Sequence, residues 1–217
     1  MLVLASNSPR RRELLALSGW AFHVRPVDVD ETPLPGESPA GYVERLARHK
    51  GRTALVQAAP GESVVAADTT VADGGRILGK PRHAAEAQAM LRQLRGRNHQ
   101  VYTAVAVLNA AGLEIAVVCA TQVPMRAYSD AEIEAYIATG DHFDKAGAYA
   151  IQHRGFDPVI GLTGCYANVM GLPLCHLSRL LRQAALDGVL SGEALARTCQ
   201  AALAYDCPVY HSILEAI

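Results

Sequence analysis

Two serines and a proline precede three consecutive arginines close to the amino terminus. Residues 6–12 read SNSPRRR and directly follow the apolar residues 2–5. Ser8 is a good N-cap, and Pro9 suits the first position of a helix. The arginines would then lie in the first turn, where the helix dipole disfavours cations. A bound anion such as phosphate would explain them, and a solvated basic face is the ordinary alternative.

Asp68 is the second candidate, because it follows a short apolar run. Residues 63–67 predict a strand that is covered on both faces and ends at Asp68. A carboxylate there would lie at the carboxyl edge of a sheet, where α/β proteins bind ligands, although an Asx turn would also explain it. Together with the arginines, Asp68 suggests metal-assisted phosphate chemistry, with carboxylate oxygens on Mg²⁺ and cations on phosphates.

The segment before the second predicted helix is acidic. Asp28, Asp30 and Glu31 offer further hard oxygen ligands, but an alternating acidic loop is more often simply solvated. Lys50 falls on the polar side of the helix that begins at Ser38-Pro39, where a surface lysine is the usual finding. These residues alone do not decide between a site and a solvated surface.

Lys80 ends a glycine-rich segment that resembles a phosphate-binding P-loop. The next residue is Pro81, which supplies neither a hydroxyl group nor a backbone N–H, so the P-loop interpretation fails. Lys80 remains a plausible separate phosphate contact. Further along, Asp144-Lys145 is either a surface ion pair or part of a site. Gln152 carries an amide suited to reading the edge of a nucleobase.

The elements that would position these residues alternate between strands and helices, which predicts an α/β or α+β fold. A capping box at Ser129 and Glu132 marks one helix start, and a turn at residues 73–75 predicts a hairpin. The expected strands are 2–6, 22–26, 63–67, 76–78, 101–108 and 113–123, and the expected helices are 8–18, 38–55, 84–94, 129–139, 174–186 and 191–205.

Composition excludes several classes of protein. The chain has 217 residues, is 50% hydrophobic and carries a formal net charge of −1, so no general attraction to nucleic acid or to a membrane surface is expected. No apolar run is long enough to span a bilayer. The five cysteines have no zinc-like spacing and predict a reduced, cytoplasmic protein. The histidines are scattered along the chain and lack the spacing of a zinc site, so the sequence does not indicate a zinc hydrolase.

Taken in order, these segments resemble the Maf family of nucleoside triphosphate pyrophosphatases. The resemblance covers about residues 1–185 and is carried by residues 6–11, Glu31, Lys50, 67–69, 79–81 and 144–152. It implies a two-lobed Maf/ITPase-like α/β fold, in which helices flank a mixed twisted β-sheet with a central cleft, commonly as a homodimer. Residues 1–187 would form the pyrophosphatase domain, and residues 188–217 a helical extension with a packing or dimer role.

The resemblance also implies roles for individual residues. Asp68 would be the proton acceptor and, with Glu31, would hold a divalent cation, Mg²⁺ or Mn²⁺. The triphosphate would be bound by Ser8, Arg10, Lys50 and Lys80. Arg11, Thr69 and Gln152 would set the nucleotide preference, and this set resembles the subgroup acting on dTTP and UTP.

Two positions depart from the usual family pattern, and other functions stay open. Ala150 and His153 replace glycines, so the floor of the base site could differ. The products would be a nucleoside monophosphate and pyrophosphate, with removal of modified nucleotides or arrest of cell division as the wider purpose. The alternatives are a non-catalytic nucleotide-binding regulator of division and a phosphatase that releases orthophosphate.

Overall fold

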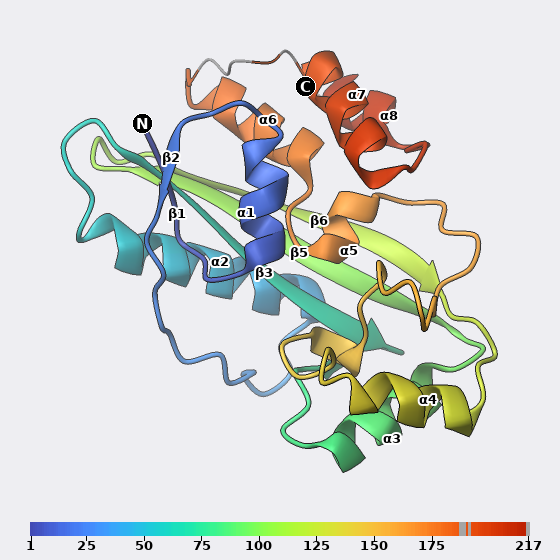
Figure 1. Ribbon diagram of the computed structural model, residues 1–217. Helices are drawn as coiled ribbons and strands as arrows, with labels where there is room; N and C mark the ends of the chain where they lie inside the picture. The colour runs from blue at the N-terminus through green and yellow to red at the C-terminus, as the bar shows by residue number, and fades with distance from the viewer. Residues whose placement is uncertain (187–189, 191, 216–217) are drawn as a thin grey trace.

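A single mixed sheet forms the centre of the computed structural model, which describes residues 1–186, 190 and 192–215 (Figure 1). The strand order is β2-β1-β3-β5-β6, and β4 pairs with β3 off this path. β1 is parallel to β2 and β3, and the remaining pairs are antiparallel. The strands are β1 (Leu2–Leu4), β2 (Phe22–Val24), β3 (Ser63–Asp73), β4 (Arg76–Leu78), β5 (Asn98–Asn109) and β6 (Glu114–Pro124).

Helices cover both faces of this sheet. α2 packs on one face, while α1, α5 and α6 lie on the other, with α3 and α4 grouped near the far end of the long strands (Figure 1). The helices are α1 (Pro9–Ala16), α2 (Pro39–Leu55), α3 (Ala84–Leu94), α4 (Asp130–Ala138), the 3₁₀ turn η1 (Ala146–Ala148), α5 (Tyr166–Met170), α6 (Leu174–Gln183), α7 (Gly192–Leu203) and α8 (Tyr210–Glu215).

Alternation along β3 divides its side chains between the two faces. Val64 and Ala66 pack with the α2 side, whereas Val65 and Ala67 pack with α1 and α6, as expected when successive side chains of a strand point to opposite faces. A second cluster around α3, α4 and η1 continues the α1 side beyond the middle of β3. The core therefore has two parts on that side, and the mixed α/β fold expected from the sequence is confirmed.

The prediction that a strand ends at Asp68 is wrong. β3 continues through Asp68 to Asp73, because Thr69, Thr70 and Val71 extend the pairing with β5. β-branched residues favour such extended structure, and the prediction gave this preference too little weight. Asp68 therefore lies within a long strand and not at the edge of a parallel sheet.

The other predicted elements differ mainly at their ends. The helix at 84–94 and the hairpin after β3 are confirmed, as are the N-caps at Ser8 and Ser38 and the capping box at Ser129. α6 ends at Gln183, earlier than expected, and the two short helices α5 and α8 were not expected. The start of the predicted helix at 191 lies outside the described residues.

The carboxyl-terminal helices pack against the body of the protein. Leu195 of α7 belongs to the same buried cluster as Leu177 and Leu181 of α6, with Cys199 and Leu203 packed against it. Residues 192–203 therefore pack against α6. None of the helices in the described part of the chain has the length and apolar character that crossing a membrane requires.

Candidate active site

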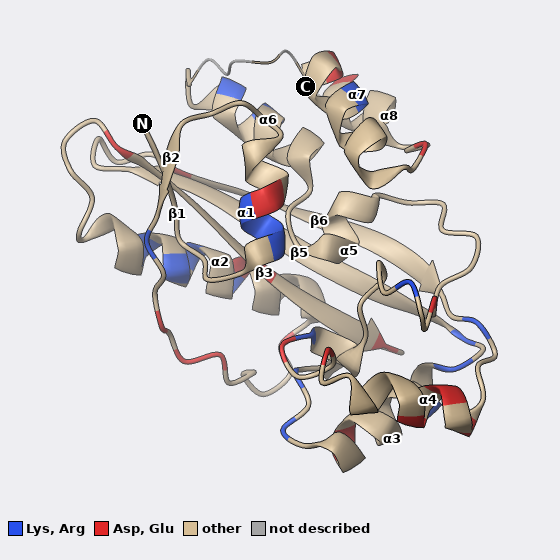
Figure 2. Cartoon of the chain, in the orientation of Figure 1, with Lys and Arg blue, Asp and Glu red and all other residues tan. Residues whose placement is uncertain are grey.

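A polar cavity of about 140 Å³ lies where the two parts of the core meet. Its walls come from α1, α2, β3, η1, α5 and the loops that carry Glu31 and Lys80. Figure 2 shows basic residues at the first turn of α1 and acidic residues along the loop that leads to α2. The cavity lining includes nearly all the residues selected from the sequence: Ser8, Arg10, Arg11, Glu31, Lys50, Asp68, Thr69 and Lys80.

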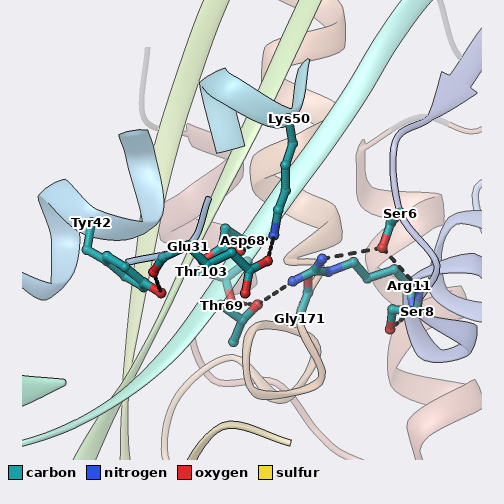
Figure 3. Close-up of polar contacts among 10 residues, drawn as sticks. All are labelled: Ser6, Ser8, Arg11, Glu31, Tyr42, Lys50, Asp68, Thr69, Thr103 and Gly171. Carbon is teal, nitrogen blue, oxygen red and sulfur yellow. Dashed lines mark hydrogen bonds and ion pairs between the residues drawn. The ribbon is translucent and has the colours of Figure 1, made fainter. Parts of the chain in front are cut away.

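Lys50 joins two carboxylates at one side of the cavity (Figure 3). Its Nζ lies 2.5 Å from Glu31 Oε1 and 2.6 Å from Asp68 Oδ1. Lys50 and Asp68 are buried at 8% and 5% exposure, whereas the Glu31 side chain is 42% exposed. Lys50 is therefore not the surface lysine that its helix pattern favoured, because its ammonium group compensates a buried carboxylate.

The two carboxyl groups differ in their acidity. Burial raises the pKa of Asp68, and the opposing effects of Lys50 and Arg11 do not cancel this rise. Burial also acts to raise the pKa of Glu31, but its hydrogen bond and charge interaction with Lys50 lower the pKa overall. The difference follows from exposure, since Glu31 keeps contact with solvent. Asp68 therefore binds a proton more readily than an ordinary aspartate, and Glu31 less readily than an ordinary glutamate, as the directions of their pKa shifts show.

Tyr42 of α2 holds the acidic loop in place. Its hydroxyl donates a hydrogen bond of 2.8 Å to the backbone carbonyl of Glu31 (Figure 3). Arg45, one turn later, donates to the carbonyl of Thr32 and pairs with Glu37. The loop is thereby attached to α2 at Glu31 itself and at Thr32 directly after it. Sequence reasoning missed Tyr42, whose position on the apolar side of the helix gave only a packing signal.

Arg11 crosses from α1 to the opposite side of the cavity. Its Nε donates to the Gly171 carbonyl at 2.8 Å, Nη2 to Thr69 Oγ1 at 2.9 Å, and Nη1 to Ser6 Oγ at 3.3 Å. Burial lowers the pKa of Arg11, and the charge of Asp68 partly opposes this effect. Arg11 therefore connects three segments, in addition to lining the cavity. The carbonyl of Gly171 reaches it from a glycine with φ of +104°, a conformation that favours glycine.

A chain of hydroxyl groups continues from Thr69 into the core. Thr69 and Thr103 are directly opposed on β3 and β5, and their hydroxyl oxygens lie 3.0 Å apart. The Thr103 hydroxyl also donates to the Asn168 carbonyl at 2.9 Å. Thr103 and Asn168 are fully buried. Thr103 was not selected from the sequence, although a threonine inside the apolar run of β5 was the available signal.

Lys80 lines the cavity from the loop between β4 and α3. Lys80 is exposed and follows Gly79, whose carbonyl accepts a 3.1 Å hydrogen bond from the Gly147 N–H. Gly147 has φ of +71°, and a Cβ there would lie 2.9 Å from Val71. The glycine therefore permits the close approach that fixes the Lys80 turn. The Ser8 hydroxyl caps α1 by accepting a hydrogen bond from the Arg11 N–H.

Similarity to known sequences shows to which family the chain belongs. The sequence model of the Maf-like protein family matches residues 1–184. The chain belongs to this family. The dTTP/UTP pyrophosphatase of Anaeromyxobacter dehalogenans (strain 2CP-1 / ATCC BAA-258) is 53% identical over 186 residues, which cover 84% of this chain and 93% of that protein. The dTTP/UTP pyrophosphatase of Myxococcus xanthus (strain DK1622) is 52% identical over 186 residues, covering 86% and 93%.

Solved structures give a weaker likeness. The Ham1 protein of Staphylococcus aureus matches at 17% identity and a TM-score of 0.46, over 73% of this chain and 79% of that chain. The family membership therefore depends on the sequence matches. The matched residues 1–184 include every residue that lines the cavity, and the match ends directly after α6.

Gln152 does not line the cavity of this Maf-like structure, and neither do Asp28 and Asp30 of the acidic segment. Gln152 is exposed and lines a separate open hollow beside Arg10, Asp144 and Lys145. Lys145 itself is buried, and its Nζ bonds Asp141 Oδ1 at 2.8 Å and Asp144 Oδ1 at 2.5 Å. The exposed ion pair considered from the sequence is thus a buried lysine between two carboxylates, at the boundary of both hollows.

The two departures from the family pattern have structural explanations. Ala150 is buried and does not have a positive φ, so its Cβ causes no backbone strain. Its backbone N–H donates a hydrogen bond to the Tyr136 hydroxyl. His153 organises a turn, because its Nδ1 accepts hydrogen bonds from the N–H groups of Gly155 and Phe156. Neither residue lines the cavity that contains Asp68.

The donor set around Lys50 fits a hard divalent cation. Glu31 and Asp68 present carboxylate oxygens to one ammonium group, and Mg²⁺ commonly takes one or two carboxylates together with water and substrate phosphates. Among the residues that the structure describes, no group of three or more His, Cys, Asp or Glu side chains could hold a metal by itself.

Proposed function

We propose that this chain hydrolyses nucleoside triphosphates, preferentially dTTP and UTP, to the monophosphate and pyrophosphate. The observation that carries the proposal is Asp68, a buried carboxylate of raised pKa that shares a polar cavity with Lys50, Lys80 and Arg10. The names of the two relatives at about half identity support the same reaction and the same nucleotides.

Asp68 acts as the general base in the proposed reaction. It removes a proton from water as the water oxygen attacks the α-phosphorus, and the bond from that phosphorus to the pyrophosphate oxygen breaks. The proton stays on the Asp68 carboxyl group, and pyrophosphate leaves. A base of raised pKa holds the proton more firmly, which favours this transfer near neutral pH.

The cations bind the phosphates and compensate charge on the leaving group. Lys80 and Arg10 line the cavity from opposite segments, and the amino-terminal end of α1 offers backbone N–H groups beside Ser8. Cations positioned where negative charge builds up stabilise the transition state more than the ground state. Lys50 has the additional role of holding Asp68 and Glu31 together.

Glu31 and Asp68 would hold the divalent cation, Mg²⁺ or Mn²⁺. When bound, such a cation supplies Lewis acidity and charge neutralisation at phosphate oxygens. Tyr42 contributes by fixing the backbone of Glu31, so that its carboxylate stays directed at Lys50 and Asp68.

Product analysis tests the proposal. Purified protein with Mg²⁺ should convert dTTP and UTP to monophosphate and pyrophosphate, separated by ion-exchange chromatography. Asp68→Asn should lower kcat by about 10²- to 10⁴-fold, which is the usual contribution of a general base. In the native enzyme, kcat should fall at low pH as the raised pKa of Asp68 is crossed, because the protonated carboxyl group cannot accept a proton.

Asp73→Asn is the matched control. Asp73 is a second buried carboxylate on β3, paired with Arg97 outside the cavity, so its loss should affect stability and leave turnover intact. Orthophosphate as the product would favour a phosphatase. Binding of nucleotides without turnover would favour the regulatory protein. Equal loss of activity in both variants would remove Asp68 from its role.

Wider properties stay predictions from the family resemblance. They include a homodimer, a cytoplasmic location, the domain boundary at residue 187 and a link to modified nucleotides or to cell division. Gln152 keeps its predicted role in nucleotide preference as a hypothesis, since it lies in the neighbouring hollow.

A further inference from the structure

The hydrogen bonds around Thr103 determine in which direction the hydroxyl protons of the chain point. Thr103 Oγ1 has two oxygen neighbours, Asn168 O at 2.9 Å and Thr69 Oγ1 at 3.0 Å. A carbonyl oxygen has no proton to give, so the proton in the first contact must come from Thr103. A hydroxyl group has a single proton, and the proton in the second contact must therefore come from Thr69.

The reverse arrangement is unfavourable at this position. If Thr103 donated to Thr69, its oxygen would face the Asn168 carbonyl at 2.9 Å without a proton between them. Thr103 is fully buried, so water cannot compensate for the lost bond. A buried polar group that loses its hydrogen bond in this way destabilises the folded protein. The chain of protons thus runs from Arg11 to Thr69, then to Thr103, and ends on Asn168.

Thr69 consequently meets a ligand as an acceptor. A threonine hydroxyl has one proton and two lone pairs. The proton of Thr69 is directed to Thr103, and one lone pair accepts from Arg11 Nη2 at 2.9 Å. The second lone pair remains. Thr69 lines the cavity and is only partly buried, so this lone pair is the part of the hydroxyl group left for a ligand.

Gly171 keeps the same hydroxyl group accessible. A Cβ at this position would lie 3.1 Å from Thr69 Oγ1 and 3.2 Å from Arg11 Nε. Any other residue would therefore crowd the acceptor and the guanidinium group beside it. Arg11 uses three described contacts, to Ser6, Thr69 and Gly171, of the five N–H donors that an arginine has. The Thr69 oxygen, an acceptor, and the Arg11 guanidinium group, a donor, therefore lie side by side in the cavity wall.

We infer that Thr103, acting through Thr69, makes this cavity select nucleobases with a ring N–H between two carbonyl groups, and reject cytosine. Uracil and thymine have that edge, in which the N–H meets the Thr69 lone pair and a carbonyl oxygen can accept from Arg11. Cytosine has a bare nitrogen lone pair at the same ring position, which would oppose the lone pair of Thr69. Thr103 is a positioning residue here, since it does not line the cavity.

The inference rests on the proposed function for its substrate, and it explains a preference between pyrimidines. The first test compares kcat/KM for UTP and CTP. Thr103→Val keeps the shape and removes the acceptor for the Thr69 proton, so that proton becomes free to point at the ligand. The UTP-to-CTP ratio should fall about tenfold, the size of one hydrogen bond in a buried site. The change should appear mainly in KM, because the base lies away from the α-phosphorus.

Two variants serve as controls. Thr103→Ser retains the hydroxyl group and should retain the native ratio. Thr121→Val removes another buried hydroxyl group next to Asn168, one that donates to Cys165 O and accepts from Asn168 Nδ2. It should lower stability without changing the ratio. An unchanged ratio in Thr103→Val, or an equal change in Thr121→Val, overturns the inference.

A second test uses the native protein alone, so it does not depend on the folding of any variant. 3-Methyl-UTP lacks the ring N–H, and 5-methyl-UTP carries the same methyl group at a different ring position. The native protein should turn over 5-methyl-UTP as it does UTP and reject 3-methyl-UTP. Equal use of both analogues, or of UTP and CTP, overturns the inference while leaving pyrophosphate release intact. If no triphosphate is hydrolysed, the proposed function fails, and calorimetric binding of the same four nucleotides decides the selectivity.

Discussion

Replacement of Lys50 by methionine is the most direct test of the charge arrangement in the cavity. The methionine side chain keeps the packing of α2 but removes the ammonium group that lies 2.6 Å from Asp68 and 2.5 Å from Glu31. Asp68, at 5% exposure, would then be a buried carboxylate without its closest counter-charge. We expect the variant to be markedly less stable than the native protein.

The size of the loss follows from exposure. Removing one partner of a buried ion pair costs about 3–5 kcal/mol. The Glu31 side chain is 42% exposed and can regain water, so the cost falls mainly on Asp68 and should lie at the lower end, about 3 kcal/mol. For a domain of this size, about 2–4 °C of Tm corresponds to each kcal/mol, which gives a decrease of about 6–12 °C.

The deficit should depend on pH, with a defined sign. Burial already raises the pKa of Asp68 in the folded protein, and loss of Lys50 should raise it further. An acid whose folded-state pKa is raised destabilises the folded protein increasingly as pH rises through that range. The difference between variant and native protein should therefore be largest in mildly alkaline buffer and shrink as Asp68 becomes protonated.

Thermal and urea unfolding over a series of pH values measures this effect. Arg48→Met is the matched control, because Arg48 lies on the same helix and pairs with Glu44 and Glu114 at the surface, at 29% side-chain exposure. Its loss should cost about 0–1 kcal/mol. Equal destabilisation of the two variants, or a Lys50 deficit that is constant with pH, would refute the assignment of Lys50 as the counter-charge of Asp68.

Two further predictions concern other parts of the structure. Burial lowers the pKa of His99 to about 4, so its protonation should weaken folding by up to about 3 kcal/mol as the pH falls from about 6.5 to about 4, and His99→Gln should remove that part of the acid sensitivity in urea unfolding. Gly147→Ala should lower kcat/KM about tenfold or more by displacing the Lys80 turn against Val71, whereas Gly36→Ala, with φ of +72° and open space around it, should cost only about 1 kcal/mol of stability and leave kinetics unchanged.

Local signals in the sequence predicted the helix starts well. Ser38-Pro39 and the capping box at Ser129 bring their own hydrogen-bond partners within three residues, so the cap geometry is set by neighbours in the chain. The bounds predicted for α3 match those of the structure. The identity of Glu31, Lys50 and Asp68 as candidates came from residue types and from the family resemblance, and the structure brings them into contact.

Other features depended on contacts between distant segments and had no local signal. Asp68 lies within β3 because β5 pairs beside it, and β5 begins far along the chain. Lys50 is buried because the acidic loop folds back over α2, where Tyr42 holds it. The importance of Thr103 depends on its register opposite Thr69 and on the carbonyl of Asn168. Periodicity alone gives none of these three relations.

Asp68 and Thr69 are neighbours on one strand, yet their side chains leave β3 on opposite faces, toward α2 and toward α1 and α5 respectively. In the proposed function, the two faces of the strand would therefore carry two different tasks within one cavity. If the proposed roles hold, a substitution near Thr69 would alter the choice of nucleobase without moving the Lys50 ammonium group, and one near Lys50 would alter the hydrolytic step and leave the Thr69 hydroxyl in place. Such separation makes the fold adaptable, since a lineage could exchange its nucleotide and keep its chemistry.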